Sequence, residues 1–423
     1  MATGKWAIKR SFIDRLRGWK EKFFWRAFLA INKFYTKIFS RELYRLKDFR
    51  TLSFEDILSQ SPAIASLNKE NNYFLLHASY GDKWSILSFL AEHFKLYSNS
   101  FVIACHEDRG LIEIFLGPAT MAERFIFIDL GHLNQLSGFF RPVSKLSMPL
   151  ADSWYAEGCK LLVTSFFIDH GLPPGTIRHL HIVYYPYFNE LCSLHGVSYA
   201  ALLKVLLYLP AATKSSLPSY YSEHDYLAAK GISRCSSLNA SSPLLPAILF
   251  NVVNFSHIPL ATAQISFLTS LLEKHGYRVL LNVTQSAGSE ELASLVASHH
   301  REAVLVSVPP TLLALVCNNV HAIIGILGGA MNVAVQFSGA HVLSLQTPAR
   351  FTGCSEDELY GEWGKERIWE WIDQDWPCLH PGRVVVNTFI GDPSTLTYES
   401  LTQALQSFLQ QLPAPGPRQP NFF

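Results

Sequence analysis

The stretch LLHASYGDKWSILSFL (75–90) places a carboxylate where an apolar run gives way to a helix-like run. Gly81 and Asp82 occupy that junction. An Asp here can cap the helix, because its side-chain oxygen accepts a hydrogen bond from an amide of the first turn. It can also act as a general base if the junction faces a cleft, since a carboxylate takes a proton from an attacking hydroxyl. Both interpretations stay open from these residues alone.

A second junction carries small residues. Gly328, Gly329 and Ala330 stand between a strand-like run and a helix-like run. Small side chains allow a ligand to approach the backbone, and the N–H groups at a helix start suit a diphosphate. Asn332, in the first turn, is placed to bond a phosphate or ribose oxygen. A plain Gly-Gly turn is the competing interpretation.

Polar residues follow two further strand-like runs. Asn254 and Ser256 come after the first strand of the second half, and Thr284 and Gln285 come after the next. The carboxyl ends of parallel strands face the crevice of an open α/β sheet, so these residues are candidates for binding a donor. Ordinary loop positions explain them equally well.

Four residues of the first half are candidates for an acceptor side: Gly81, Lys83, His106 and Glu107. The last two belong to CHEDRG (105–110), directly after the second strand. Acids at this place also suit the first turn of a helix, where the helix dipole favours them.

Two histidines are considered as ligands of a metal ion. His179 and His181 lie two apart on a strand and therefore share a face. A zinc site needs further ligands, and Asp169 and His170 are the only nearby candidates. No metal or other cofactor is expected.

The elements that must position these residues alternate from residue 73 onward, as in an α/β protein. In the first half, we predict strands at 73–77, 101–105, 125–129, 160–164 and 180–184, and helices at 82–96, 108–116, 187–194 and 198–208. In the second half, we predict strands at 247–253, 277–283, 303–308, 321–326 and 341–346, and helices at 260–274, 289–299, 331–337 and 398–412. A looser stretch at 211–246, rich in Ser and Pro, ends in a predicted domain boundary.

Length and composition fit two domains with large cores plus an appendage, because 49% of the 423 residues are hydrophobic and only 16% are charged. The seven cysteines form no CxxC pair. Their odd number argues against a disulfide framework or a zinc ribbon and favours reduced thiols in the cytosol.

The first 50 residues are electrostatically distinct, with 14 Lys/Arg against four Asp/Glu, whereas the rest of the chain is acidic. Phe12, Leu16, Trp19 and Phe23 follow helical spacing. Charges interrupt every apolar stretch, which excludes a signal peptide and a membrane-spanning helix. A basic, aromatic helix suits an anionic membrane surface. A helix pair packed on the protein body is the alternative, and nucleic acid is disfavoured because the remainder is acidic.

Residues 303–349 contain no Asp, Glu, Lys or Arg. Pro309-Pro310, Gly328-Gly329 and Asn332 interrupt this run, so it does not read as a membrane-spanning helix. Short strands buried on both faces explain it better.

Taken together, these features resemble the heptosyltransferase family, glycosyltransferase family 9, over roughly residues 73–350. The likeness rests on Gly81-Asp82 after the first strand, VLLNVTQSAGSEELASLVAS, VLVSVPPTLLALVCNN and VHAIIGILGGAMNVAVQFSGAHVLSLQTP. The family implies a GT-B fold, two Rossmann-like domains facing a cleft, with Asp82 as the base of an inverting transfer. One departure stands out: Leu327 and Asn332 occupy places where the family usually has Asp and His.

The resemblance implies an inverting glycosyltransferase that moves a sugar from a nucleotide-sugar donor to a bacterial surface glycan or lipid-linked acceptor, as in lipopolysaccharide or polysaccharide biosynthesis. No metal is needed if helix N-termini neutralise the leaving diphosphate. The alternatives are another GT-B-like transferase, for pyruvyl or glycerophosphate groups, and a non-catalytic scaffold of a glycan-assembly complex, which the loss of the Asp at Leu327 suggests.

The expected organisation has four parts: a membrane-association segment, an acceptor domain, a nucleotide-sugar domain, and a returning helix with a tail, at 1–60, 61–235, 236–390 and 391–423. We expect the protein in the cytoplasm, peripherally associated with the inner face of the cytoplasmic membrane through residues 1–50. We expect no nucleic-acid partner.

Overall fold

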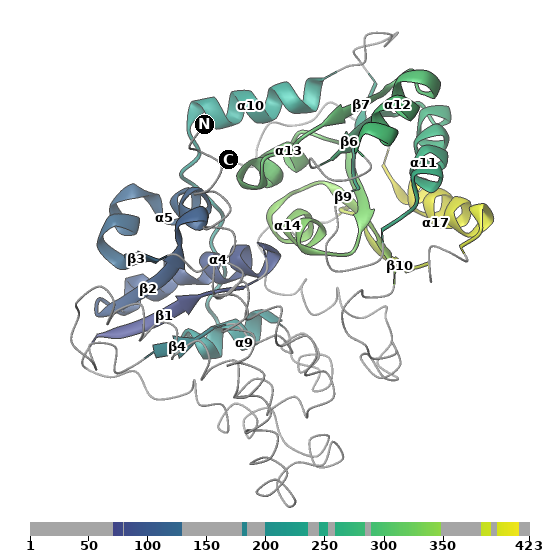
Figure 1. Cartoon of the computed structure of the whole chain (residues 1–423). Coiled ribbons are helices and arrows are strands. Elements are labelled where there is room, and N and C mark those ends of the chain that lie inside the picture. The colour runs from purple at the N-terminus through teal and green to yellow at the C-terminus, as the bar shows by residue number, and fades with distance from the viewer. Residues whose placement is uncertain are drawn as a thin grey trace, which may run out of the picture. The chain divides into compact units, whose positions relative to one another are not determined.

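The computed structural model of the chain describes residues 71–78, 80–128, 180–183, 199–235, 245–252, 259–283, 289–347, 382–390 and 396–413 (Figure 1). The chain divides into two compact units, Met1–Ser53 and Phe54–Phe423, and every described residue belongs to the second. The predicted basic N-terminal helices, the strand at 160–164 and the helix at 187–194 lie outside the described residues.

The first sheet has four parallel strands in the order β3-β2-β1-β4. Its strands are β1 Asn72–Leu76, β2 Ser100–Cys105, β3 Phe125–Ile128 and β4 Leu180–Ile182. The strands β1 and β2 are almost entirely buried, as expected for a parallel sheet covered on both faces. The predictions at 73–77, 101–105, 125–129 and 180–184 are confirmed to within two residues.

Three helices accompany this sheet: α4 Tyr80–Leu96, α5 Arg109–Arg124 after the 3₁₀ turn η1 His106–Asp108, and α9 Tyr199–Leu206. The helix α5 is kinked at Gly117, whose φ of 73° lies in the region that glycine favours, immediately before Pro118. A side chain at Gly117 would lie 2.6 Å from the ring of Tyr220. The kink therefore makes room for that tyrosine.

The second sheet has six parallel strands in the order β10-β9-β8-β5-β6-β7. They are β5 Ala247–Asn251, β6 Arg278–Asn282, β7 Ala303–Val306, β8 Ala322–Ile326, β9 His341–Gln346 and β10 Val385–Phe389. Two separate parallel sheets, each accompanied by helices, confirm the predicted α/β class (Figure 1).

Helices cover both faces of the second sheet. Three of them share one buried core with the sheet: α11 Thr262–Lys274, α12 Ser289–His299 and α17 Tyr398–Gln411. The short helix α13 Leu313–Asn318, after the 3₁₀ turn η3 Pro310–Leu312, packs against α14 Gly329–Phe337, and α14 lies against β8 and β9. The closing helix was predicted at 398–412, and it packs on α11.

Neither β10 nor α10 Glu223–Arg234 was predicted, and α10 lies within the stretch expected to be loose. The start of α10 carries a capping box, because the Ser222 hydroxyl accepts a hydrogen bond from the Asp225 amide and the Asp225 carboxylate accepts one from the Ser222 amide. That Ser-x-x-Asp spacing was the missed sequence signal.

The uncharged run 303–349 folds into short buried elements. Every residue of β8 and β9 is buried, and so are most residues of α13 and α14. None of the helices in the described part of the chain has the length and hydropathy needed to span a bilayer.

Candidate functional site

Asp82 lies in the first turn of α4 and is buried, with 6% of its surface exposed. The helix begins at Tyr80, two residues before Asp82. The carboxylate is therefore inside the first turn and not at the N-cap that the helix-cap interpretation required. A negative charge at this place is stabilised by the helix dipole.

Gly81 and Gly329 touch. A Cβ atom on Gly81 would lie 2.7 Å from the Cα of Gly329, and one on Gly329 would lie 2.9 Å from the Gly81 nitrogen. The starts of α4 and α14 thus meet backbone to backbone, and neither position has room for a side chain. The sequence analysis expected Gly329 to admit a ligand; the atoms that approach it in the structure belong to Gly81.

Further contacts extend this meeting of helices. Ser85 donates a hydrogen bond to the side-chain oxygen of Gln336 (2.7 Å), and both residues are buried. Trp84 packs against Phe115 and Phe337 with ring centroids 5.3 and 5.2 Å apart. The contact surface between α4 and α14 is accordingly apolar and closely packed, with one internal hydrogen bond.

Lys83 is paired with Asp108. Its ammonium lies 2.7 Å from a carboxylate oxygen of Asp108, and both side chains are largely buried. Asp108 stands at the N-cap of α5 but makes no side-chain cap hydrogen bond, because the carboxylate turns to Lys83. The pair ties the first turn of α4 to the carboxyl end of β2. Asp108 belongs to CHEDRG, the cluster that the sequence places after the second strand.

The other acceptor-side candidates are on the surface. His106 and Glu107 are exposed in η1, and the ring of His106 stacks on Phe127 (5.8 Å). Burial and the nearby carboxylate of Asp108 raise the pKa of the Cys105 thiol to about 12, so this cysteine stays protonated at neutral pH and is no nucleophile.

Two buried asparagines end neighbouring strands of the second sheet. Asn282 on β6 donates to the side-chain oxygen of Asn251 on β5 (2.7 Å) and accepts from the Val308 amide (2.9 Å). Asn254, Ser256, Thr284 and Gln285 follow these strands and lie outside the described residues. Neither asparagine was predicted, although each follows an apolar run at the end of its strand, in AILFN and RVLLN.

The start of α14 contains the remaining donor-side candidates. Gly328 is the N-cap, Gly329 and Ala330 open the helix, and all three are partly exposed. Asn332 is also partly exposed, and its amide bonds the Gly328 carbonyl (3.0 Å). Leu327, where the family usually has Asp, is 6% exposed and thus part of the core.

No group of three His, Cys, Asp or Glu side chains arranged for a metal occurs among the described residues. His181 is buried, with Nε2 3.2 Å from the Asn72 side-chain oxygen and its ring stacked on Phe74. It is part of the first core. His179, Asp169 and His170 lie outside the described residues.

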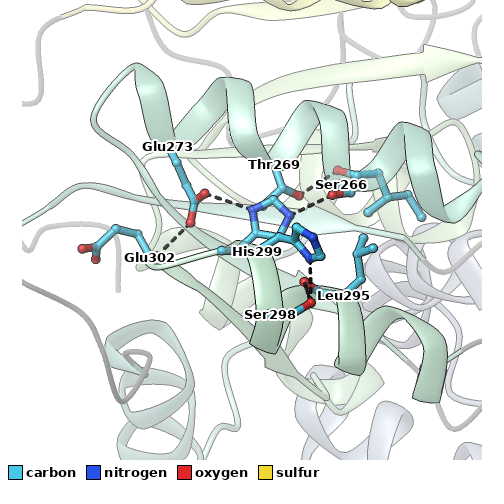
Figure 2. A network of polar contacts seen from close by, with 9 residues as sticks. Ser266, Thr269, Glu273, Leu295, Ser298, His299 and Glu302 are labelled. Atoms are coloured by element: carbon cyan, nitrogen blue, oxygen red, sulfur yellow. Dashed lines mark hydrogen bonds and ion pairs between the residues drawn. The ribbon is translucent and has the colours of Figure 1, made fainter.

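A different polar network joins α11 to the turn between α12 and β7 (Figure 2). Ser266 lies 2.9 Å from Nε2 of His300, whose Nδ1 lies 3.0 Å from Glu273. The connectivity matches a Ser-His-acid triad. However, Ser266 lies inside α11, where backbone N–H groups bond within the helix, and these amides are not available as oxyanion donors. We therefore interpret the network as structural.

This chain resembles known proteins in its structure. No protein-family model matches the sequence, and no curated protein matches it. The solved structures it resembles include a glycosyl transferase family 9 protein from Veillonella parvula, at 12% identity and a TM-score of 0.47, covering 82% of this chain and 99% of that one. Another is E. coli ADP-heptose lps heptosyltransferase II, at 13% identity and a TM-score of 0.44, covering 81% and 99%.

A third is an epimerase, not a transferase: the putative UDP-N-acetylglucosamine 2-epimerase from Listeria monocytogenes, at 11% identity and a TM-score of 0.42, covering 81% of this chain and 89% of that one. The first two belong to the family that the sequence motifs resemble.

Proposed function

We propose that this protein is a glycosyltransferase that moves a sugar from a nucleotide-sugar donor to a surface-glycan or lipid-linked acceptor, as in lipopolysaccharide or polysaccharide biosynthesis. One observation carries the proposal. The two strand-to-helix junctions that the sequence singled out meet at Gly81 and Gly329, which are far apart along the chain. Each junction follows the carboxyl end of a parallel strand, where α/β proteins bind ligands.

Asp82 is the proposed general base. As the acceptor hydroxyl oxygen attacks the anomeric carbon, the carboxylate takes the hydroxyl proton, and the bond from that carbon to the donor phosphate oxygen breaks. The nucleoside diphosphate leaves with the electron pair. Asp82 is only 6% exposed. An acceptor therefore reaches it only if the residues packed around the first turn of α4 move apart.

The donor is assigned to the carboxyl edge of the second sheet, at Gly328, Ala330 and Asn332 and at the loops after β5 and β6. Gly328, Gly329 and Ala330 at the start of α14 are partly exposed residues, and a helix N-terminus suits a diphosphate. The proposal uses no metal, since helix N-termini can neutralise the leaving group.

The experiment is a thermal-shift screen of the full chain against nucleotides and nucleotide sugars, followed by an assay of donor consumption. A ligand at 100 times its dissociation constant should stabilise the fold by about 2.7 kcal/mol. The matched control is free phosphate at the same ionic strength. Absence of any nucleotide-dependent shift would remove the transferase proposal.

A second candidate, a non-catalytic scaffold in glycan assembly, is suggested by Leu327, which is buried where the family has a carboxylate. The same screen separates the candidates, because a scaffold keeps its fold and binds no nucleotide sugar.

A further inference from the structure

An apolar cluster is exposed at and before α10. Six large hydrophobic side chains are exposed in the described part of the chain, and three of them, Tyr220, Tyr226 and Leu227, fall within eight residues. Leu227 is the most exposed, at 61%. Scattered exposed apolar residues need no explanation, but a cluster indicates a surface that contacts something.

The helix α10 beneath this cluster is held in place by contacts with its neighbours. The inner face of α10 buries Ala229 and Ser233, and the helix packs on α13. Arg278 of β6 donates to the carbonyl oxygen of Ser233 (2.8 Å), near the C-terminal end of α10. Tyr220 lies over the kink at Gly117. The exposed side chains are therefore held outward by packing beneath them.

Cations accompany the apolar side chains. Leu227, Lys230 and Arg234 follow each other at helical spacing on α10, on a stripe that Glu223 begins, and all three are exposed. The acids of α10, Glu223 and Asp225, are confined to its first turn, where the helix dipole offsets them and Asp225 completes the capping box. Away from that turn the surface is apolar and basic.

We propose that this surface, the α10 face (Tyr220, Tyr226, Leu227, Lys230 and Arg234), binds an anionic lipid surface. Aromatic and aliphatic side chains flanked by Lys and Arg fit the headgroup region, where apolar groups are buried while cations contact lipid phosphates. A second copy of the chain fits less well, because a two-fold contact would place Lys230 and Arg234 near their own copies.

The α10 face lies within the folded unit and is thus distinct from the basic segment of residues 1–50. Stable attachment to a membrane generally takes two signals. Binding of the α10 face to a lipid surface does not depend on the proposed transferase activity.

The test is cosedimentation of the full chain with vesicles containing phosphatidylglycerol and, in parallel, with vesicles of phosphatidylcholine alone. We expect Leu227→Ser to lower the partition coefficient several-fold on the anionic vesicles. Lys230→Gln combined with Arg234→Gln should lower it about 25-fold, at roughly fivefold per charge. Matched controls are Leu96→Ser, at a leucine of similar exposure (55%) on α4, and Lys274→Gln, at an exposed lysine of α11.

Three outcomes would overturn the inference: unchanged partitioning of both α10 variants, equal losses on the two kinds of vesicle, or a wild-type dimer that Leu227→Ser dissociates in sedimentation velocity. The last would make the α10 face a contact between copies. Thermal melts of the variants should match the wild type, because the replaced side chains are exposed.

Discussion

Single residues decide how the two halves of the folded unit meet. The contact between Gly81 and Gly329 leaves no room for a Cβ on either side, so any other residue must push the two helix starts apart. Close packing thereby explains one glycine at each sequence junction, Gly81 and Gly329, without a ligand.

Gly329→Ala should destabilise the fold by about 1–3 kcal/mol, because the added methyl meets backbone atoms that cannot rotate away. Gly231→Ala on α10 is the matched control. A Cβ there meets nothing within 4 Å, and replacing a glycine inside a helix should stabilise by roughly 0.5–1 kcal/mol. Urea unfolding measures both, and equal effects of the two substitutions would contradict the contact.

Asp82→Asn tests the base. Asn keeps the size of the side chain and removes the basic oxygen, so donor consumption should fall roughly 10²- to 10⁴-fold while the full chain stays folded. Glu123→Gln, at an exposed acid near the end of α5, should leave turnover unchanged. Full activity of Asp82→Asn would reduce Asp82 to a residue that stabilises the start of α4.

At the scale of elements, polar groups join helices to neighbouring segments. The carboxylate of Glu273 on α11 accepts from the Glu302 amide (2.7 Å) and pairs with His300, while Ser266 contacts the other ring nitrogen (Figure 2). Both ring nitrogens of His300 thus have partners on α11.

His300→Ala should cost about 1–3 kcal/mol of unfolding free energy, because it removes a buried ring that bonds two partly buried partners, Ser266 and Glu273. His299→Ala, at the exposed neighbouring histidine, should stay within about 0.5 kcal/mol of the wild type. Denaturant titration of the two variants separates them. If both changed stability equally, the network would contribute nothing specific.

His93 links α4 to the end of α9, since its Nδ1 lies 2.7 Å from the Leu207 carbonyl and its side chain is fully buried. Burial lowers the pKa of His93 to about 4, below its ordinary value of 6.5. The unfolded chain therefore binds more protons between these values, so the stability from His93 is complete above pH 6.5 and is lost as the pH falls toward 4.

Lowering the pH from 7 to 5 should reduce the free energy of unfolding by about 2 kcal/mol through the titration of His93. His93→Phe should flatten that part of the pH dependence, whatever its effect on stability at pH 7. The measurement is urea unfolding at several pH values, with His224→Phe, at an exposed histidine of α10, as control. An unchanged slope in His93→Phe would show that the ring titrates normally.

At the scale of the whole molecule, charge separates the first 50 residues from the folded unit. Removing residues 1–50 should lower binding to anionic vesicles and leave the melting temperature of the remainder close to that of the full chain. Cosedimentation measures the binding to vesicles, and calorimetry measures the melting temperature. Loss of the folded unit on truncation would instead favour packing of the segment on the protein body.

The sequence by itself determined the class of fold. Most of the predicted strands and helices in the described regions are present, because a buried parallel strand and an amphipathic helix leave a periodic pattern of apolar residues. The edge strand β10 was missed, and α10 was taken for a loose stretch. Both lie at margins where few apolar residues are buried, so the pattern is weak there.

Only the tertiary structure decided what the candidate residues touch. That Gly81 meets Gly329, that Lys83 turns to Asp108 and that Ser266 and Glu273 converge on His300 all depend on how separate segments pack. Local spacing carries no information about these distances, because a residue's neighbours across a core are set by the helices and strands between them. For this reason the sequence could name Asp82 as a candidate base but could not place it, buried, beside the meeting of α4 and α14.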